Sequence, residues 1–220
     1  MDDIENDLRK RLTSVAKQVW EEGLCYGSAG NISAKIPETE NVLIKPTGFR
    51  FCDLRPDDFL IVNYNTREVV KGDRKPSIET PFHTLMYQKR NDVGGVVHTH
   101  SHYATILSTA GVELVPMGMG FYSAPGLIKG VRIAKFAPPG SEELAKNLGE
   151  AIEGRIAAVL PHHGPVAIGK SIEEAYNVAK AVEDLAKYQF EVMQVGKVPP
   201  VPESMIKSFT ELANKRDSIF

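Results

Sequence analysis

Three of the chain's six histidines alternate along one short run, VVHTHSH, as His98, His100 and His102. Side chains alternate between the two faces of a strand, so these imidazoles would share a face if the strand continued through the run. Neutral imidazole is the most common protein ligand of zinc and similar divalent ions, and catalytic sites typically use three protein ligands. The spacing therefore indicates a metal site, with hydrogen-bonded histidines on a surface strand as the alternative.

A second histidine pair, His162 and His163, follows the apolar run AAVLP, which is typical of a buried strand. Adjacent residues of an extended chain face opposite ways, so one of the two should reach an ion held by the first cluster. A separate structural role for each histidine is the alternative. Two clusters at strand ends favour the metal.

Three segments have the character of an anion site. GSAGN (27–31) and PTG (46–48) are small-residue turns whose backbone N–H groups could face an anion. Ser77 is predicted to cap a helix that begins at Ile78, and Lys75 precedes that cap. The N–H groups and the positive dipole end of such a helix suit a phosphate. Each turn by itself is equally compatible with a purely structural role.

Glu79 is expected just inside the first turn of this helix, as the acidic residue best placed for proton transfer. The alternative is a first-turn glutamate that only complements the helix dipole. His83 follows four residues later on the same helical face. We expect it to be structural or to support the ligands, although it could also bind the ion.

The elements that position these residues follow from apolar spacing, capping residues and turn residues. Helices are predicted over residues 3–22, 78–90, 103–111, 142–153 and 172–195, with a short helix after a Pro-rich linker. Strands are predicted as four short runs within residues 31–70, and at 94–98, 131–136 and 157–161. The pattern predicts one α/β domain with helices on both faces of a sheet.

The composition is that of an ordinary globular protein of 220 residues, with 42% hydrophobic and 25% charged residues and a formal net charge of −2. Basic residues are scattered, which argues against a nucleic-acid partner. No apolar run approaches the roughly 20 residues of a membrane span, and the first residues are acidic where a signal peptide would be basic and then apolar. We expect no membrane partner, a cytoplasmic location, and reduced thiols at Cys25 and Cys52.

Taken together and in this order, GSAGNIS, LIKPTG, KPSIETPFH, VVHTHS and HHGPVAIGK resemble the class II aldolase and adducin family, over roughly residues 5–195. The resemblance implies a three-layer α/β/α fold with a central mixed, largely antiparallel sheet. It implies one domain over residues 1–220, with a linker and helix from residue 196. It also implies a homotetramer with sites at subunit borders that hold Zn²⁺, or another divalent ion such as Mn²⁺ or Co²⁺.

The resemblance implies a role for individual residues. His98, His100 and His163 would bind the metal, with His162 not involved and His102 only supporting or structural. Glu79 would be the acid/base that also binds the metal when substrate is absent. The phosphate of a small phosphorylated sugar would lie among Gly30, Asn31, Thr47, Gly48, Ser77 and Ile78. A tyrosine from a neighbouring subunit's loop would handle the aldehyde oxygen, and Tyr122, or Phe121 by position, corresponds to it.

The activity implied is cleavage of a phosphorylated ketose such as L-fuculose 1-phosphate to dihydroxyacetone phosphate and an aldehyde. L-Ribulose-5-phosphate 4-epimerases share the HTHS run and Lys45, but that branch has aspartate at the position of Glu79 and an acid in the loop where this chain reads GMGFYSAPG. A metal-dependent decarboxylase is a further alternative within the family. A non-enzymatic adducin-like module is the alternative from another class.

Overall fold

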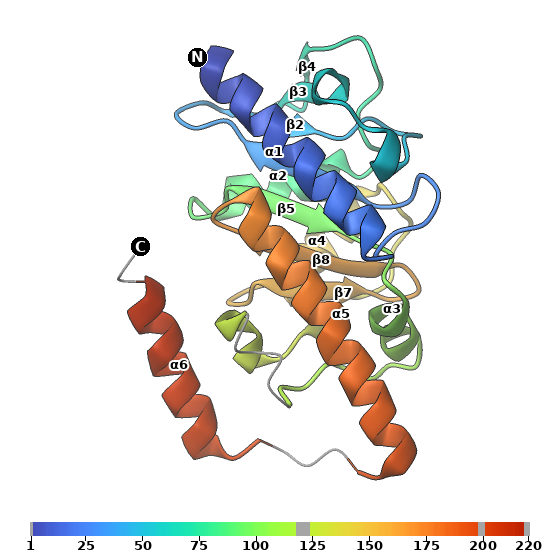
Figure 1. The fold of residues 1–220 in the computed structure, drawn as a ribbon, viewed down its shortest axis with the longest axis vertical. Coiled ribbons are helices and arrows are strands. Elements are labelled where there is room, and N and C mark those ends of the chain that lie inside the picture. The colour runs from blue at the N-terminus through green and yellow to red at the C-terminus, as the bar shows by residue number, and fades with distance from the viewer. Residues whose placement is uncertain (1, 118–123, 198–200, 218–220) are drawn as a thin grey trace.

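A computed structural model of the chain describes residues 2–117, 124–197 and 201–217 (Figure 1). Its strands are β1 (Asn31–Lys35), β2 (Asn41–Ile44), β3 (Leu60–Asn63), β4 (Val69–Lys71), β5 (Gly95–His98), β6 (Arg132–Ile133), β7 (Ala157–Leu160) and β8 (Gly164–Gly169). They form one sheet in the order β4-β3-β2-β1-β5-β8-β7-β6. Neighbouring strands are antiparallel except β6 and β7, which are parallel, so the sheet is mixed and largely antiparallel as predicted.

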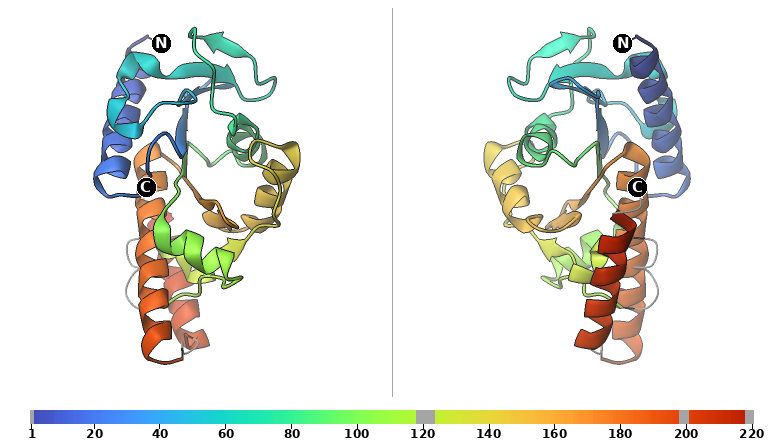
Figure 2. Two further views of the ribbon diagram at one scale, coloured as in Figure 1. Left: turned by 90° about the vertical axis from the view of Figure 1, so that its right-hand side faces the viewer. Right: turned by 90° about the vertical axis from the view of Figure 1, so that its left-hand side faces the viewer.

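Helices cover both faces of this sheet (Figure 2). The helices of the structure are α1 (Asp2–Glu21), α2 (Thr80–Lys89), α3 (His102–Thr109), α4 (Glu142–Ala151), α5 (Ile172–Val195) and α6 (Glu203–Asp217). Helices α1, α3 and α5 share one apolar core with one face of the sheet, and α2 and α4 share a second core with the other face. The predicted three-layer α/β/α fold is confirmed. No helix in the described ranges is long and apolar enough to cross a membrane.

Serine hydroxyl groups cap two of the helices. Ser141 Oγ accepts a hydrogen bond from Leu144 N–H at the start of α4. Ser171 Oγ accepts one from Glu174 N–H at the start of α5. The Glu174 carboxylate, however, accepts from the N–H of Lys170 and not from that of Ser171, so the capping box is only half formed.

Two predicted boundaries are wrong. Helix α2 begins at Thr80, because Ser77 Oγ accepts from Glu79 N–H in a turn that precedes the helix and does not cap it. The strand predicted over residues 131–136 is shorter in the structure, where β6 contains only Arg132 and Ile133. Strand β5 ends at His98, as predicted, and α3 begins at His102, so the strand does not continue through the run from 98 to 102.

Strand β8 is present where no strand was predicted, and it lies between β5 and β7 in the centre of the sheet. It is antiparallel to both neighbours, so β5 and β7 run in the same direction and their carboxyl ends meet at one edge of the sheet. The two histidine clusters follow these carboxyl ends. The first residue of β1, Asn31, pairs with His98 at the same edge.

Candidate metal centre

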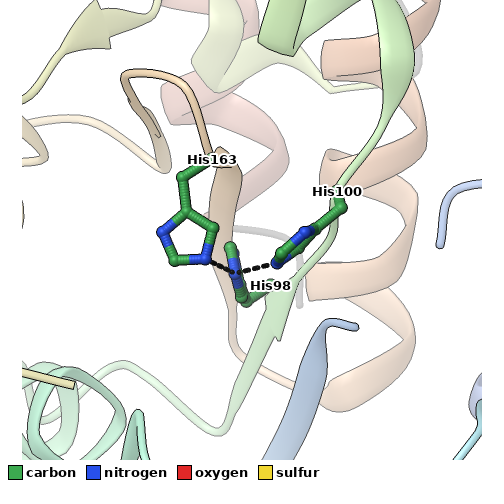
Figure 3. Close-up of side chains that lie close together, drawn as sticks. All are labelled: His98, His100 and His163. Atoms are coloured by element: carbon green, nitrogen blue, oxygen red, sulfur yellow. Dashed lines mark hydrogen bonds between the residues drawn. The ribbon is translucent and has the colours of Figure 1, made fainter. Parts of the chain in front are cut away.

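Three imidazoles converge at this edge (Figure 3). Nε2 of His98 lies 3.1 Å from Nε2 of His100 and 3.3 Å from Nε2 of His163. One ring nitrogen from each histidine lies within 4.8 Å of the others. His98 ends β5, His100 follows it in the connection to α3, and His163 comes from the turn between β7 and β8. The structure therefore brings together the three predicted ligands from two distant parts of the chain.

The turn between β7 and β8 explains why His163 and not His162 reaches the cluster. His162 has a φ of +59°, a left-handed conformation that is uncommon for a residue with a side chain. It leaves His162 exposed while His163 points inward. Gly164 is needed next, because a Cβ there would collide with the carbonyl oxygen of Thr99. The close contact of the two histidine-bearing segments depends on this glycine.

The protonation of the three rings suits a cation. Burial lowers the pKa of His98 and of His100 to about 3, and it also lowers the pKa of His163. The rings are therefore neutral near pH 7. Nδ1 of His98 lies 3.0 Å from the carbonyl oxygen of Pro165, which can only accept, so Nδ1 carries the proton. Nε2 of His98 is left with its lone pair directed at the other two rings.

Glu79 completes the cluster from the turn before α2. Its Oε2 lies 3.3 Å from Nε2 of His98 and accepts a 2.7 Å hydrogen bond from Nδ2 of Asn31. Its Oε1 is buried and makes no hydrogen bond, although Nε2 of His163 lies 3.2 Å away. A buried carboxylate oxygen without a donor is costly. Together with the three imidazoles it forms a nitrogen and oxygen donor set that fits zinc or a similar divalent ion.

A cavity of about 440 Å³ opens beside this cluster. Its lining includes most of the residues predicted for the site, namely Gly30, Asn31, Thr47, Gly48, Ser77, Ile78, Glu79, His100 and His163. His98 is fully buried behind them. Tyr122 and Phe121 lie outside the described residues. The structure thus brings the residues predicted for the metal and for the phosphate together around one cavity.

The part of the cavity predicted to bind a phosphate has fewer free backbone N–H groups than its turns suggest in the sequence. The N–H of Thr47 donates to Lys75 O, and the N–H of Ser77 donates to Lys45 O. Among the described residues, the N–H groups of Gly48 and Ile78 have no protein acceptor. Ser77 Oγ accepts from Asn31 Nδ2 and from Glu79 N–H, so its own proton is available to a ligand.

Lys45 also lines the cavity, although no role at this site was predicted for it from the sequence. The side chain is only 2% exposed, and its Nζ donates to Ser28 O at 3.2 Å. Burial lowers the pKa of Lys45 to about 8. A buried ammonium with donors to spare would attract a ligand phosphate. The signal that could have shown it is a lysine that ends an apolar strand, in VLIKP.

The opposite wall of the cavity is apolar. It is lined by Phe136, Ala137, Pro139, Leu144, Leu160 and Pro161. Phe136 leaves 65% of its surface exposed, which is unusual for a phenylalanine. The cavity is therefore cationic and hydrogen-bonding at one end and apolar at the other.

His102 and His162 lie apart from the three converging nitrogens. Both are exposed, and both line a second cavity of about 480 Å³, whose wall also includes His100 and His163. The alternation of His98, His100 and His102 breaks at the start of α3, so His102 does not share their direction. The two exposed histidines thus lie outside the cluster of His98, His100 and His163.

The sequence and the fold are similar to those of known proteins. The sequence model of the protein family described as Class II Aldolase and Adducin N-terminal domain matches residues 10–190. A 5-methylthioribulose-1-phosphate/5-deoxyribulose-1-phosphate aldolase of Rhodospirillum rubrum is 34% identical, over 93% of this chain and 90% of that protein. A 3-oxo-tetronate 4-phosphate decarboxylase of Escherichia coli K12 is 33% identical, over 85% and 88%. A solved L-fuculose 1-phosphate aldolase superposes with a TM-score of 0.88 at 31% identity, over 94% and 96%. The chain therefore belongs to the class II aldolase and adducin family.

Proposed function

We propose that the protein is a divalent-metal-dependent aldolase that cleaves a small ketose 1-phosphate to dihydroxyacetone phosphate and an aldehyde. One observation carries the proposal. Three neutral imidazole nitrogens and an unbonded carboxylate oxygen meet in a cavity that also holds a buried lysine and free backbone donors. This combination suits a substrate with a carbonyl to polarise, a carbon to protonate after cleavage and a phosphate to bind.

The residues divide the reaction between them. His98, His100 and His163 would hold a divalent ion, which would supply Lewis-acid stabilisation of the negative charge that develops when the C3–C4 bond breaks. The free N–H groups of Gly48 and Ile78, with Lys45, bind the phosphate. The other residues predicted for the phosphate site are Gly30, Asn31, Thr47 and Ser77. Together these groups fix the carbon chain relative to Glu79.

Glu79 handles the proton at C3. In cleavage the C4 hydroxyl loses its proton to solvent, the C3–C4 electron pair stays on C3, and Glu79 takes a proton from solvent and delivers it to C3, so that protons balance overall. Its Oε1 is the oxygen free to do this, since Oε2 accepts from Asn31. Tyr122 stays the predicted partner for the aldehyde oxygen.

The apolar wall favours a substrate whose aldehyde end lacks hydroxyl groups. Among the relatives, the Rhodospirillum rubrum protein is named for 5-methylthio and 5-deoxy ketose phosphates. A methyl or methylthio terminus would lie against Phe136 and Leu160 without leaving a polar group unpaired. We therefore place a 5-deoxy or 5-methylthio ketose 1-phosphate ahead of L-fuculose 1-phosphate.

The test is release of dihydroxyacetone phosphate from these three ketose phosphates by the metal-loaded protein. Cleavage should stop on treatment with a chelator and return with Zn²⁺, Mn²⁺ or Co²⁺. Glu79→Gln should lower kcat by about 100-fold or more. Glu150→Gln, an exposed glutamate of α4, is the matched control and should leave kcat unchanged. Metal-loaded protein that cleaves none of the three would refute the proposal.

The same assay separates the alternatives. Release of carbon dioxide from a phosphorylated oxo acid would instead identify a decarboxylase, the activity named for the Escherichia coli relative. Formation of a 4-epimer would identify an epimerase. Within the described residues Glu79 is the only carboxylate that lines the cavity, whereas epimerisation needs groups on both faces of the aldehyde. Absence of stoichiometric metal would favour an adducin-like module.

The proposal includes Zn²⁺ as the resident ion, a homotetramer with sites at subunit borders and a cytoplasmic location. Metal analysis of purified protein identifies the ion, and light scattering gives the mass of the assembly. A monomer of 24.2 kDa in solution would contradict the tetramer.

A further inference from the structure

A chain of buried hydrogen bonds leads from Glu79 away from the cavity, into the layer between α2 and the sheet. Nδ2 of Asn31 donates to Glu79 Oε2, and Oδ1 of Asn31 bonds to Nε2 of His83. Nδ1 of His83 lies 2.7 Å from Ser33 Oγ, and Ser33 Oγ lies 2.8 Å from the hydroxyl of Tyr87. All five residues are buried, with His83 fully so.

Regular geometry brings these residues together. Asn31 and Ser33 are two apart on β1 and therefore project from the same face of the sheet. Glu79, His83 and Tyr87 are spaced by four, from the turn before α2 along one side of that helix. The side chains from β1 alternate with those from the turn before α2 and from α2 itself. The network is therefore part of the buried core between the sheet and this helix.

The chemistry of the groups fixes the direction of every proton. The Glu79 carboxylate can only accept, so the Asn31 amide nitrogen faces it and the amide oxygen faces His83. The amide oxygen also only accepts, so Nε2 of His83 must carry the proton. In the neutral ring Nδ1 then accepts from the Ser33 hydroxyl, and Ser33 Oγ accepts from the Tyr87 hydroxyl. One tautomer of His83 satisfies the whole chain.

We propose that His83 is a positioning residue that holds Glu79 in place for catalysis through the side chain of Asn31. The inference rests on the proposed function. Without the His83 proton, the Asn31 amide oxygen would lose its partner and only the bonds from Nδ2 to Ser77 and Glu79 would orient the amide, so that Glu79 Oε2 could lose its 2.7 Å donor. The carboxylate would then leave the position from which Oε1 faces the imidazoles.

Two near-isosteric substitutions test the proposal. The amide nitrogen of His83→Gln can occupy the place of Nε2 and still donate to Asn31, whereas His83→Asn is too short and offers its amide near the place of Nδ1. We expect kcat to fall about 10- to 100-fold in His83→Asn with a smaller change in KM, and to stay within about threefold of wild type in His83→Gln. Equal kcat values in the two variants, measured at equal metal content, would overturn the proposal.

Tyr87→Phe is the control for a structural role. It removes the last donor of the same buried chain without touching the bond to Asn31. It should lower the melting temperature while kcat stays near that of wild type. A fall in kcat as large as that of His83→Asn would mean that the network acts only through stability, and would refute the positioning role.

A readout independent of activity tests the tautomer itself. In protein labelled with ¹⁵N-histidine, His83 should give a slowly exchanging Nε2–H signal that disappears in His83→Gln. An Nδ1–H signal for His83 would overturn the assignment. If the wild-type protein cleaves no ketose phosphate, the proposed function fails, whereas the tautomer and the position of Glu79 in crystals of both variants still decide the positioning role.

Discussion

Nδ1 of His98 lies 3.0 Å from the carbonyl oxygen of Pro165, across the ladder between β5 and β8. The acceptor belongs to the main chain, so the tautomer and orientation of the His98 ring are set by the pairing of two central strands. His98 is fully buried and its neighbours in the cluster are partly exposed. The fold therefore fixes one proposed ligand rigidly, and the other two approach it from connecting segments.

His100 and His102 should respond differently to substitution, although they are two residues apart. Nε2 of His100 lies 3.1 Å from Nε2 of His98, whereas the His102 side chain is exposed at the start of α3. His100→Ala should abolish stoichiometric metal binding, and His102→Ala should leave it largely intact. Metal analysis by mass spectrometry after gel filtration measures both. The reverse result would mean that the cluster in Figure 3 is not the metal site.

The neighbouring pair His162 and His163 provides a second contrast. His163→Ala should remove most bound metal, because His163 lies 3.3 Å from Nε2 of His98. His162→Gly should keep the metal and should not destabilise the protein, because glycine adopts the φ of +59° without strain. Chemical denaturation of the metal-free proteins compares their stabilities. Metal loss in His162→Gly with retention in His163→Ala would contradict the assignment of the ligand.

The sequence was sufficient to place both histidine clusters at strand ends, because β5 and β7 are marked by local apolar runs. Strand β8 was missed, since Gly164, Pro165 and Gly169 are typical of a loop and the strand is stabilised by partners at both sides. Its pairing is long-range and leaves no local signal. Local signals therefore place each histidine cluster at the end of a strand. They do not reveal β8, the strand that lies between the two clusters and sets the distance between them.

Lys45 and Ser77 show a related limit. Lys45 has the sequence context of an ordinary strand end, and its burial results from the packing of residues 28 and 51 around it. Ser77 precedes a helix with typical capping chemistry, yet its hydroxyl bonds within the turn and leaves Glu79 in front of the helix. In both cases a tertiary contact, here to Asn31 or Ser28, decides between two locally acceptable conformations.

Glu183 of α5 should be important for the segment that carries His100. Its two carboxylate oxygens accept from the N–H groups of Tyr103 and Ala104 at 2.8 and 3.0 Å. Ser101 makes no side-chain capping bond, so Glu183 caps α3 from another helix. Glu183→Gln should lower the free energy of unfolding by about 1–2 kcal/mol and weaken metal binding.

Denaturant titrations with and without metal measure both effects of Glu183→Gln. Glu191→Gln is the matched control, because Glu191 is an exposed glutamate on the same helix. If both variants are as stable as the wild type, α3 does not depend on this cap.

The ion pair between Arg11 of α1 and Glu173 of α5 should make stability depend on pH in the acid range. Two hydrogen bonds of 2.7 Å join the side chains. The bond to Arg11 lowers the pKa of Glu173 from 4.5 to about 2. Because the folded pKa is the lower one, the contribution is complete above pH 4.5 and is lost as pH falls toward 2.

Glu173→Gln should therefore destabilise the protein near pH 7, and the difference from wild type should vanish near pH 2. Both side chains are more than 40% exposed, so solvent screening limits the effect to about 0.5–1 kcal/mol. Denaturant titrations between pH 3 and 7, repeated at high salt, measure this difference in the free energy of unfolding. Arg11→Met and the variant with both substitutions complete a double-mutant cycle, which isolates the energy of the pair. A difference that grows as pH falls would have the wrong sign and would exclude this pair as its source.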